Sequence, residues 1–352
     1  MTGAVPRWRM PAEWECHDAT WIAWPHHEPD WPGKLDAVQW VYAEIVRLLA
    51  QYENVQVLCH TPELRECALR YLHAHSVQMQ HVRLLIVPND RVWLRDSAPS
   101  FVWNADGAVG LMAWDFNAWA KYDNYQQDNK VPSAIQSLTG LPLTHATRPD
   151  DPDRRLVLEG GGIEVDGAGR VMVTEEWLLS DTQVRNPGMT RLDYERAFDL
   201  YLGCHSTIWL GDGCAGDDTH GHVDDIVRFV NLDTVVLAYE PDPADANHRS
   251  SVDNLRRLQL AAAIQPLNIV PLPYPRPVIM DGQRLPASYA NFYIANGVVL
   301  VPTFNDPNDR IALNTLAELF PSRTVVGVHA VDLVWGLGTL HCLTQQQPSM
   351  RL

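Results

Sequence analysis

The chain has 352 residues, of which 46% are hydrophobic, and its 27 basic and 43 acidic side chains give a formal net charge of −16. This length and apolar content predict a folded protein with a large core and exclude a disordered chain. The acidic excess disfavours nucleic acids and anionic membrane surfaces as partners, and it suits a small cationic ligand.

The sequence contains neither an apolar leader nor a run of 18 apolar residues. Six cysteines are scattered along the chain without a CxxC pair. We expect cysteines in this scattered arrangement to be reduced thiols. Reduced thiols and the lack of a hydrophobic span are typical of a cytoplasmic protein, so we expect that location and no membrane association.

Amphipathic helices alternate with short apolar strands along the chain. The expected helices cover residues 35–52, 63–75, 191–202, 248–264 and 308–319. The expected strands cover residues 55–58, 82–87, 207–210, 267–270 and 324–328. This alternation predicts a mixed α/β architecture. Because it resumes unchanged after the proline-rich runs 148–153 and 266–277, we interpret both runs as surface loops within one domain.

Three segments have the pattern of hairpins that turn at Asp-Gly or Asn-Gly, namely 102–111, 163–173 and 293–301. Polar candidates precede such hairpins or strands at a constant interval: Asp96, Glu159 and His222 lie 63 residues apart. A regular spacing of this kind indicates an internal repeat of ~60–70 residues.

The most distinctive stretch is a loop rich in glycine and aspartate, residues 211–225, that leads into the apolar run 226–230. If the chain is extended from His222 onward, His222 and Asp224 share one face. An imidazole beside a carboxylate forms an acid/base pair that titrates near neutral pH.

Two kinds of site fit that stretch. One is a metal site, in which the ligands would be drawn from His220, His222, Asp217, Asp218 and Asp224. The other is a metal-free site, in which the same pair serves a nucleophile from elsewhere in the chain.

Three further residues are candidates for chemistry, each with a purely structural alternative. Asp96 follows Trp93 and Arg95, and it could form either a surface ion pair or part of a cleft. Glu159 precedes three glycines, which permit close approach to a ligand or simply a turn. Cys342 stands between a glycine pair and a polar Thr-Gln-Gln run, which suits a cleft better than a core strand.

Taken together, these motifs resemble the agmatine deiminase family of guanidino-group-modifying enzymes. The matching segments, in chain order, are WLRDSAP (93–99), WDFNAW (114–119), LEGGGIEVDG (158–167), TEE (174–176), RNPGMTR (185–191), GDDTHGHVDD (216–225), PASYANFYIAN (286–296), DPND (306–309) and LHCLTQQQP (340–348). The resemblance extends from about Met10 to Pro348. It implies a five-bladed α/β-propeller of pseudo-repeated ββαβ-type units around a central cleft, formed by a single catalytic domain over residues 1–352, with no metal and no cofactor.

The resemblance also assigns roles to residues. Cys342 corresponds to the nucleophile and His222 to the general acid/base. Asp96 and Asp224 correspond to the carboxylates that hold the guanidinium, and Glu159 to the residue that orients the histidine. We expect Trp93 and Trp119 to form walls for the methylene chain of the substrate.

The implied reaction is hydrolysis of agmatine to N-carbamoylputrescine and ammonia through a covalent thiouronium, a step of putrescine biosynthesis. A deiminase of free or peptidyl arginine is the alternative, and a metal-dependent hydrolase is a more distant one. Homodimers are common in this family, and we expect one here. Four positions depart from the usual family pattern: Ala98, Trp177, His220 and Leu337.

Overall fold

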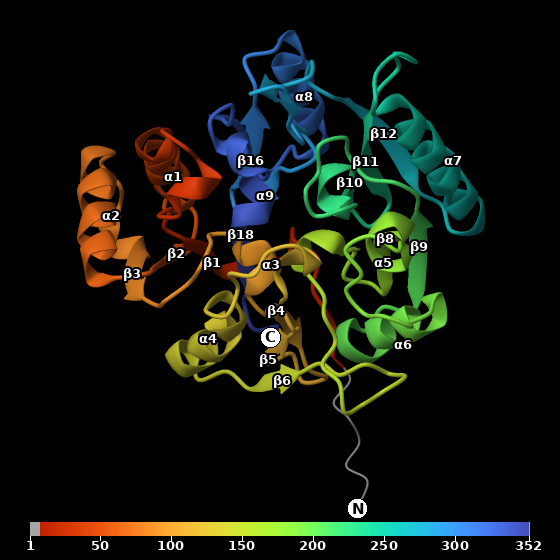
Figure 1. The fold of residues 1–352 in the computed structure, drawn as a ribbon, viewed down its shortest axis with the longest axis horizontal. Coiled ribbons are helices and arrows are strands. Elements are labelled where there is room, and N and C mark those ends of the chain that lie inside the picture. Colours follow the sequence, from red (N-terminus) through yellow and green to blue (C-terminus); the bar gives the residue numbers. More distant parts are fainter. Residues whose placement is uncertain (1–7, 352) are drawn as a thin grey trace, which may run out of the picture.

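The computed structural model describes residues 8–351 and has a mixed α/β fold, in which short sheets alternate with helices (Figure 1). The longer helices are α1 (Leu35–Leu49), α2 (Pro62–Ala74), α4 (Val131–Thr139), α5 (Glu175–Leu179), α6 (Arg191–Leu202), α7 (His248–Ile264) and α8 (Pro307–Leu319). All five helices that the sequence predicts are confirmed, and α1 ends three residues before the expected boundary.

Five sheets share one strand pattern, an antiparallel pair extended by a parallel strand. In sheet order the strands are β18 (Thr344–Pro348), β1 (His17–Ala23), β2 (Asn54–Cys59) and β3 (Val82–Ile86); β4 (Ser100–Trp103), β5 (Val109–Ala113) and β6 (Leu143–His145); β7 (Glu164–Val165), β8 (Arg170–Thr174) and β9 (Ser206–Leu210); β10 (Val227–Asn231), β11 (Thr234–Tyr239) and β12 (Asn268–Pro273); β15 (Tyr293–Ile294), β16 (Val298–Thr303) and β17 (Thr324–His329). The three predicted hairpins are confirmed as β4–β5, β7–β8 and β15–β16. A sixth, two-stranded sheet consists of β13 (Ile279–Met280) and β14 (Gln283–Arg284).

Figure 1 shows α2, α4, α6, α7 and α8 around the periphery of the molecule. The single-turn helices α3 (Leu94–Ser97) and α9 (Leu340–Leu343) lie near the middle of the same view. The chain therefore places its regular helices outside and two short helical turns, which carry Asp96 and Cys342, at the centre.

The first sheet joins distant parts of the chain. β18 pairs antiparallel with β1, and β1 pairs in parallel with β2. Since Cys342 lies two residues before β18, the pairing of these strands fixes the position of α9.

Two sequence interpretations are wrong. The chain is not extended after His222, because Val223–Asp225 form a single 3₁₀ turn and β10 begins only at Val227. The run 266–277 is not wholly a loop, since it contains β12. β12 is an edge strand, and Pro271 and Pro273 alternate along it, so their missing N–H groups can face away from β11.

The ends of helices follow local sequence signals. Asp306 and Asp309 form a reciprocal capping box at the start of α8. α1 buries one face, including Val38, Ile45 and Leu49, in the largest apolar cluster of the protein.

Candidate active site

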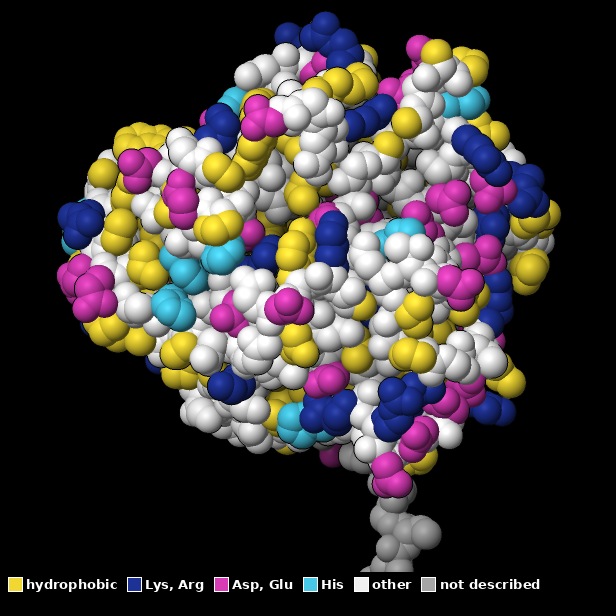
Figure 2. All heavy atoms as spheres, viewed as in Figure 1, with side chains coloured by type: hydrophobic (Ala, Val, Ile, Leu, Met, Phe, Trp, Pro, Cys, Tyr) yellow, Lys and Arg dark blue, Asp and Glu magenta, His cyan; other side chains and the backbone are white. Residues whose placement is uncertain are grey.

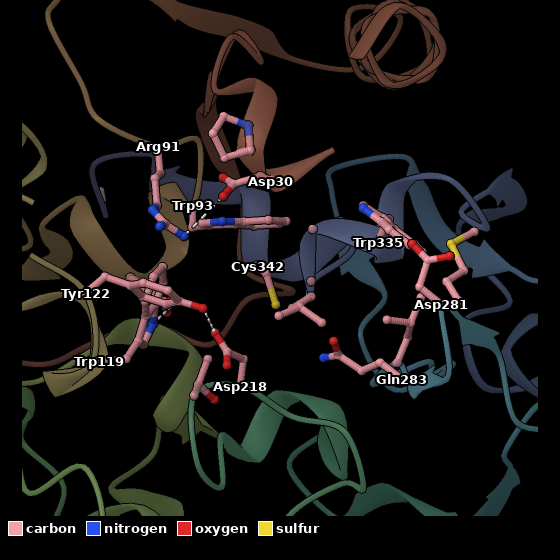
Figure 3. Close-up of a pocket in the computed structure, with 18 residues that line it drawn as sticks. Asp30, Arg91, Trp93, Trp119, Tyr122, Asp218, Asp281, Gln283, Trp335 and Cys342 are labelled. Atoms are coloured by element: carbon pink, nitrogen blue, oxygen red, sulfur yellow. Dashed lines mark hydrogen bonds and ion pairs between the residues drawn. The ribbon is translucent and has the colours of Figure 1, made fainter. Parts of the chain in front are cut away.

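A cavity of about 410 Å³ lies beside α3 and α9 (Figure 3). Asp96, Trp93, Trp119 and Cys342 all line it. Figure 2 shows that acidic and basic side chains are interspersed on the face viewed there, with no large area of one sign. Four of the sequence-predicted residues therefore line the cavity, whereas Glu159, His222 and Asp224 are buried and are not among its lining residues.

Cys342 contributes the thiol group that lines this cavity. Its side chain is 8% exposed, and its Sγ lies 3.0 Å from Nδ2 of Asn291 and 3.6 Å from Oδ2 of Asp224. Burial and the neighbouring Asp224 carboxylate raise the pKa of the Cys342 thiol well above its ordinary value. This raised pKa favours the thiol, whereas a nucleophilic cysteine usually has a lowered pKa that favours the thiolate.

His222 lies at the start of the 3₁₀ turn, completely surrounded by protein. Its Nε2 is 3.5 Å from Oε2 of Glu159, and its Nδ1 is 3.8 Å from Oδ1 of Asp96. Neither nitrogen has a hydrogen-bond partner within residues 8–351. Burial alone would disfavour the imidazolium, but the Asp96 and Glu159 carboxylates raise the pKa of His222 to about 9. The ring therefore carries a proton at neutral pH.

Glu159 is held rigidly beneath that ring. Arg185 donates from Nε to Oε1 at 3.0 Å, and Trp177 donates from Nε1 to Oε2 at 2.7 Å. Burial alone would raise the pKa of Glu159, but the Arg185 guanidinium and the His222 ring bring it to about 2. Glu159 is thus a permanent negative charge beside the imidazole.

Asp96 and Asp224 approach the histidine from two other elements. Asp96 accepts hydrogen bonds from Gly161 N at 3.0 Å and from Trp119 Nε1 at 2.9 Å. Burial, together with the Asp224 and Glu159 charges, raises the pKa of Asp96 to about 6. Oδ1 of Asp224 is buried and has no hydrogen-bond partner in the described chain, so it can still accept one.

Gly161 is the point at which these groups converge. A Cβ atom there would lie 2.6 Å from Nδ1 of His222, 2.9 Å from Oδ1 of Asp96 and 3.1 Å from Oδ2 of Asp224. The second glycine of the Gly160–Gly162 run is therefore required by close approach of three polar side chains, rather than by a turn.

Behind Asp224, a buried histidine connects two carboxylates. His341 Nδ1 lies 2.6 Å from Oδ2 of Asp224, and His341 Nε2 lies 2.8 Å from Oε2 of Glu13. Glu13 also contacts Arg228 at 2.8 Å and Arg95 at 3.3 Å. Both ring nitrogens of His341 thus lie within hydrogen-bond distance of a carboxylate, and the ring holds Asp224 in place from behind.

The outer part of the cavity is lined by paired charges and aromatic rings. Arg91 lies 3.1 Å from Asp30 and its guanidinium stacks over the ring of Tyr122, 4.1 Å from the ring centroid. Tyr122 donates to Asp218 at 2.6 Å, and Asp218 also pairs with Lys121. Figure 3 shows Asp281 and Gln283 on the opposite side of the cavity from this group.

The positions that depart from the family pattern have distinct structural settings. Ala98 has φ of −78°, which any residue adopts. Leu337 lies in the left-handed region with φ of 69° and lines the cavity. Trp177 supplies the hydrogen bond to Glu159 and packs edge-on against His222, with ring centroids 5.6 Å apart. His220 lies 2.9 Å from Oγ of Ser180.

The candidate ligands of a metal site do not converge. Asp217 accepts from the backbone of residues 219, 221 and 222, while Asp218 and His220 point to other partners. Between residues 8 and 351, no group of three or more His, Cys, Asp and Glu side chains is arranged to hold a metal ion. Over the same range, no helix has the length and apolar character needed to span a bilayer.

Sequence reasoning missed four residues that build this site: Glu13, Arg185, Asn291 and His341. Arg185, Asn291 and His341 lie within motifs that the resemblance uses, and His341 is adjacent to Cys342, so these three had a usable signal. Glu13 carries no local signal, because its partner His341 lies at the other end of the sequence.

Comparisons with known proteins identify the family of this chain. Residues 9–348 match the family described as Porphyromonas-type peptidyl-arginine deiminase. An agmatine deiminase of Pseudomonas aeruginosa is 33% identical over 368 residues, covering 97% of this chain and 96% of the relative.

Solved structures show the same relationship. The agmatine deiminase of Enterococcus faecalis superimposes with a TM-score of 0.90 at 30% identity, covering 100% of this chain and 99% of that chain. A C. jejuni agmatine deiminase has a TM-score of 0.85 at 22% identity, covering 99% of both chains, and at that identity the likeness concerns the fold alone. Since the family match and the 33% identical relative both cover almost the whole chain, this protein belongs to the Porphyromonas-type peptidyl-arginine deiminase family.

Proposed function

We propose that this protein hydrolyses agmatine to N-carbamoylputrescine and ammonia, through a covalent intermediate on Cys342. The names of its relatives support the substrate. The observation that carries the proposal is a set of buried, unpartnered polar atoms beside the cysteine: both ring nitrogens of His222 and Oδ1 of Asp224. Buried polar atoms are costly without partners, and a planar guanidinium would supply N–H donors to the carboxylate.

Asp96 and Asp224 bind the guanidinium. Two carboxylates on a planar cation fix its plane and hold its central carbon within about 3–3.5 Å of the sulfur. The positive charge of the substrate also offsets the two carboxylates that oppose a thiolate. The thiol proton leaves toward Asp224 and passes to solvent as the cation binds, since His222 is already protonated.

In the first half-reaction, the Cys342 thiolate attacks the guanidinium carbon and an S–C bond forms. His222 transfers its proton to one NH₂ group, the C–N bond breaks, and ammonia leaves. An S-alkylthiouronium cation remains on Cys342, and His222 is neutral. Glu159 keeps the ring oriented and favours its protonated form before this step.

In the second half-reaction, neutral His222 takes a proton from water, and the resulting hydroxide adds to the thiouronium carbon. The tetrahedral adduct collapses as the C–S bond breaks, the electron pair returns to sulfur, and the hydroxyl proton passes to solvent. The products are the neutral ureido compound and the thiolate. One histidine thus acts first as acid and then as base.

The outer cavity favours agmatine over arginine. Among the described residues that line the cavity, Arg91 is the one with a cationic side chain. It pairs with Asp30 and stacks on the ring of Tyr122. It is therefore not free to bind the carboxylate of arginine. Trp93 and Trp119 flank the cavity next to Asp96 and Cys342, where they suit the methylene chain of the substrate.

We further propose that the five similar sheets form a five-bladed α/β-propeller and that residues 1–352 act as one catalytic domain. The shared strand pattern of the sheets supports this arrangement. The product would be consumed in putrescine biosynthesis, and the enzyme would work as a homodimer.

The test is ammonia release from agmatine, free arginine and a blocked arginyl peptide, each with EDTA present. We expect release from agmatine, abolished in Cys342→Ala, and a mass increase on Cys342 in acid-quenched turnover samples. Release from arginine or the peptide instead would overturn the substrate, while turnover in Cys342→Ala would overturn the covalent mechanism. Loss of activity with EDTA would contradict a metal-free reaction.

A further inference from the structure

Asn291 is completely buried between Cys342 and Asp225, in the segment that precedes β15. Its Nδ2 donates to Sγ of Cys342 at 3.0 Å and to Oδ1 of Asp225 at 3.0 Å. Each of the two amide hydrogens therefore has one acceptor, and one of these acceptors is the reacting sulfur.

The orientation of this amide is fixed from its other end. Oδ1 of Asn291 accepts from Oγ1 of Thr339 at 2.8 Å and from the backbone N of His341 at 3.0 Å. The backbone N of Cys342 lies 3.4 Å from the same oxygen. Because an N–H donor can face only the carbonyl oxygen, the NH₂ group must face the sulfur and Asp225.

The sulfur needs such a donor. Its other polar side-chain contact in the described structure is Oδ2 of Asp224, which accepts the thiol hydrogen and opposes a thiolate. Burial and Asp224 raise the pKa of the thiol, whereas the Asn291 hydrogen bond acts in the opposite direction. A neutral donor stabilises the anion without competing with the substrate cation for the carboxylates.

We propose that Asn291 is a catalytic residue that stabilises the Cys342 thiolate by a hydrogen bond from Nδ2. This inference rests on the proposed function only in taking Cys342 as the nucleophile. The bond acts twice: it favours the thiolate before attack, and it stabilises the sulfur anion again when the C–S bond breaks and its electron pair returns to sulfur.

Three variants separate this role from a structural one. Asn291→Asp keeps the oxygen that accepts from Thr339 and His341, but it replaces the donor to sulfur. Asn291→Ala removes both functions. Thr339→Val removes one bond to the amide oxygen and leaves the donor to sulfur in place, so it is the matched control.

The readout is the rate at which iodoacetamide alkylates Cys342 in the full chain without substrate, at a fixed pH near 8.5. Tryptic cleavage after Arg323 gives a peptide that ends at Arg351 and contains Cys342 as its one cysteine, so mass spectrometry follows this thiol alone. Circular dichroism and thermal melting show whether each variant is folded.

We expect Asn291→Asp and Asn291→Ala to slow alkylation by about ten- to a hundredfold, the loss that a hydrogen bond to a charged group represents. Thr339→Val should stay within about threefold of the parent chain, since the donor is retained. Rates in folded Asn291→Asp within about twofold of the parent chain would overturn the proposal. Because alkylation needs no turnover, slower alkylation combined with no ammonia release from agmatine would overturn the proposed substrate and leave the role of Asn291 standing.

Discussion

Nδ1 of His341 lies 2.6 Å from Oδ2 of Asp224, and the same ring reaches Glu13 through Nε2. Burial alone would raise the pKa of Asp224, but the hydrogen bond and charge of His341 keep it below its ordinary value. His341, next to Cys342 in the sequence, therefore keeps ionised the Asp224 carboxylate that we propose binds the guanidinium.

Replacing His341 should weaken substrate binding. In His341→Leu, kcat/KM for agmatine should fall roughly 10- to 100-fold, since a hydrogen bond to a charged group is lost. The pH below which kcat/KM falls steeply should rise, because the pKa of Asp224 rises. His341→Asn places its amide near the Nδ1 position and should retain more activity than His341→Gln, which reaches toward Glu13. An unchanged pH profile in His341→Leu would contradict this role.

The pH dependence of the parent enzyme follows from the proton count. The free enzyme has a thiol and an imidazolium, whereas the first transition state has a thiolate sulfur and an imidazolium, which is one proton fewer. Below pH 9 kcat/KM for agmatine should therefore rise about tenfold per pH unit. Above about 9, where His222 loses its proton, it should level off, and below about 6, where Asp96 is protonated, it should fall more steeply.

Glu159→Gln provides the check on that assignment. It removes one of the carboxylates that raise the pKa of His222, so the upper break in the profile should move below pH 9. Glu175→Gln, on the surface and paired with Arg191 and Arg257, should leave the profile unchanged. A break that stays near 9 in Glu159→Gln would show that another group titrates there.

Gly161→Ala should inactivate the enzyme. Its methyl group would displace His222, Asp96 and Asp224 together, and misplacement by about 1 Å costs on the order of 100-fold in rate. Gly140→Ala is a useful comparison, because Gly140 has φ of +71° but open space around its α-carbon. It should lower the melting temperature without changing kcat/KM. Full activity in Gly161→Ala would mean that the polar groups need not converge.

Arg185→Gln should destabilise the fold, because it leaves the Glu159 carboxylate buried without its cation. Breaking a completely buried pair of this kind costs about 3–5 kcal/mol of unfolding free energy. Arg257→Gln removes two partly exposed ion pairs, to Glu175 and Asp253, and should cost at most ~1 kcal/mol for each. Urea denaturation measures the free energy of unfolding of both variants. Equal values would contradict the claim that the buried Glu159 carboxylate depends on the Arg185 cation.

The sequence predicted the regular helices and the site candidates because both have local signals. Residues 248–264 show an uninterrupted helical pattern, and α7 has these bounds. Cys342 and His222 stand in motifs with glycine and polar neighbours that a packed core would not favour. Helix α4 was not predicted, although Pro132 in its first turn and left-handed Gly140 at its end are ordinary helix boundaries.

What the sequence could not predict depends on contacts between distant segments. The 3₁₀ turn at Val223–Asp225 replaces the expected strand, and it brings His222 and Asp224 to one point at Gly161 without alternation along a strand. The pairing of Glu13 with His341 joins the two ends of the chain, and the hydrophobic periodicity of the sequence does not predict such a contact. The protonation of the cysteine likewise follows from burial, which a motif does not reveal.

The pairing of β18 with β1 has a consequence for biosynthesis. A ribosome makes β1 and Glu13 early, but it makes Cys342 and β18 only after most of the chain has emerged. Until that last strand docks, the nascent polypeptide has neither Cys342 in place nor the antiparallel partner of β1. We therefore expect hydrolysis of a guanidine only from a chain in which β18 has paired with β1. A chain released from the ribosome before this strand is made should be inactive.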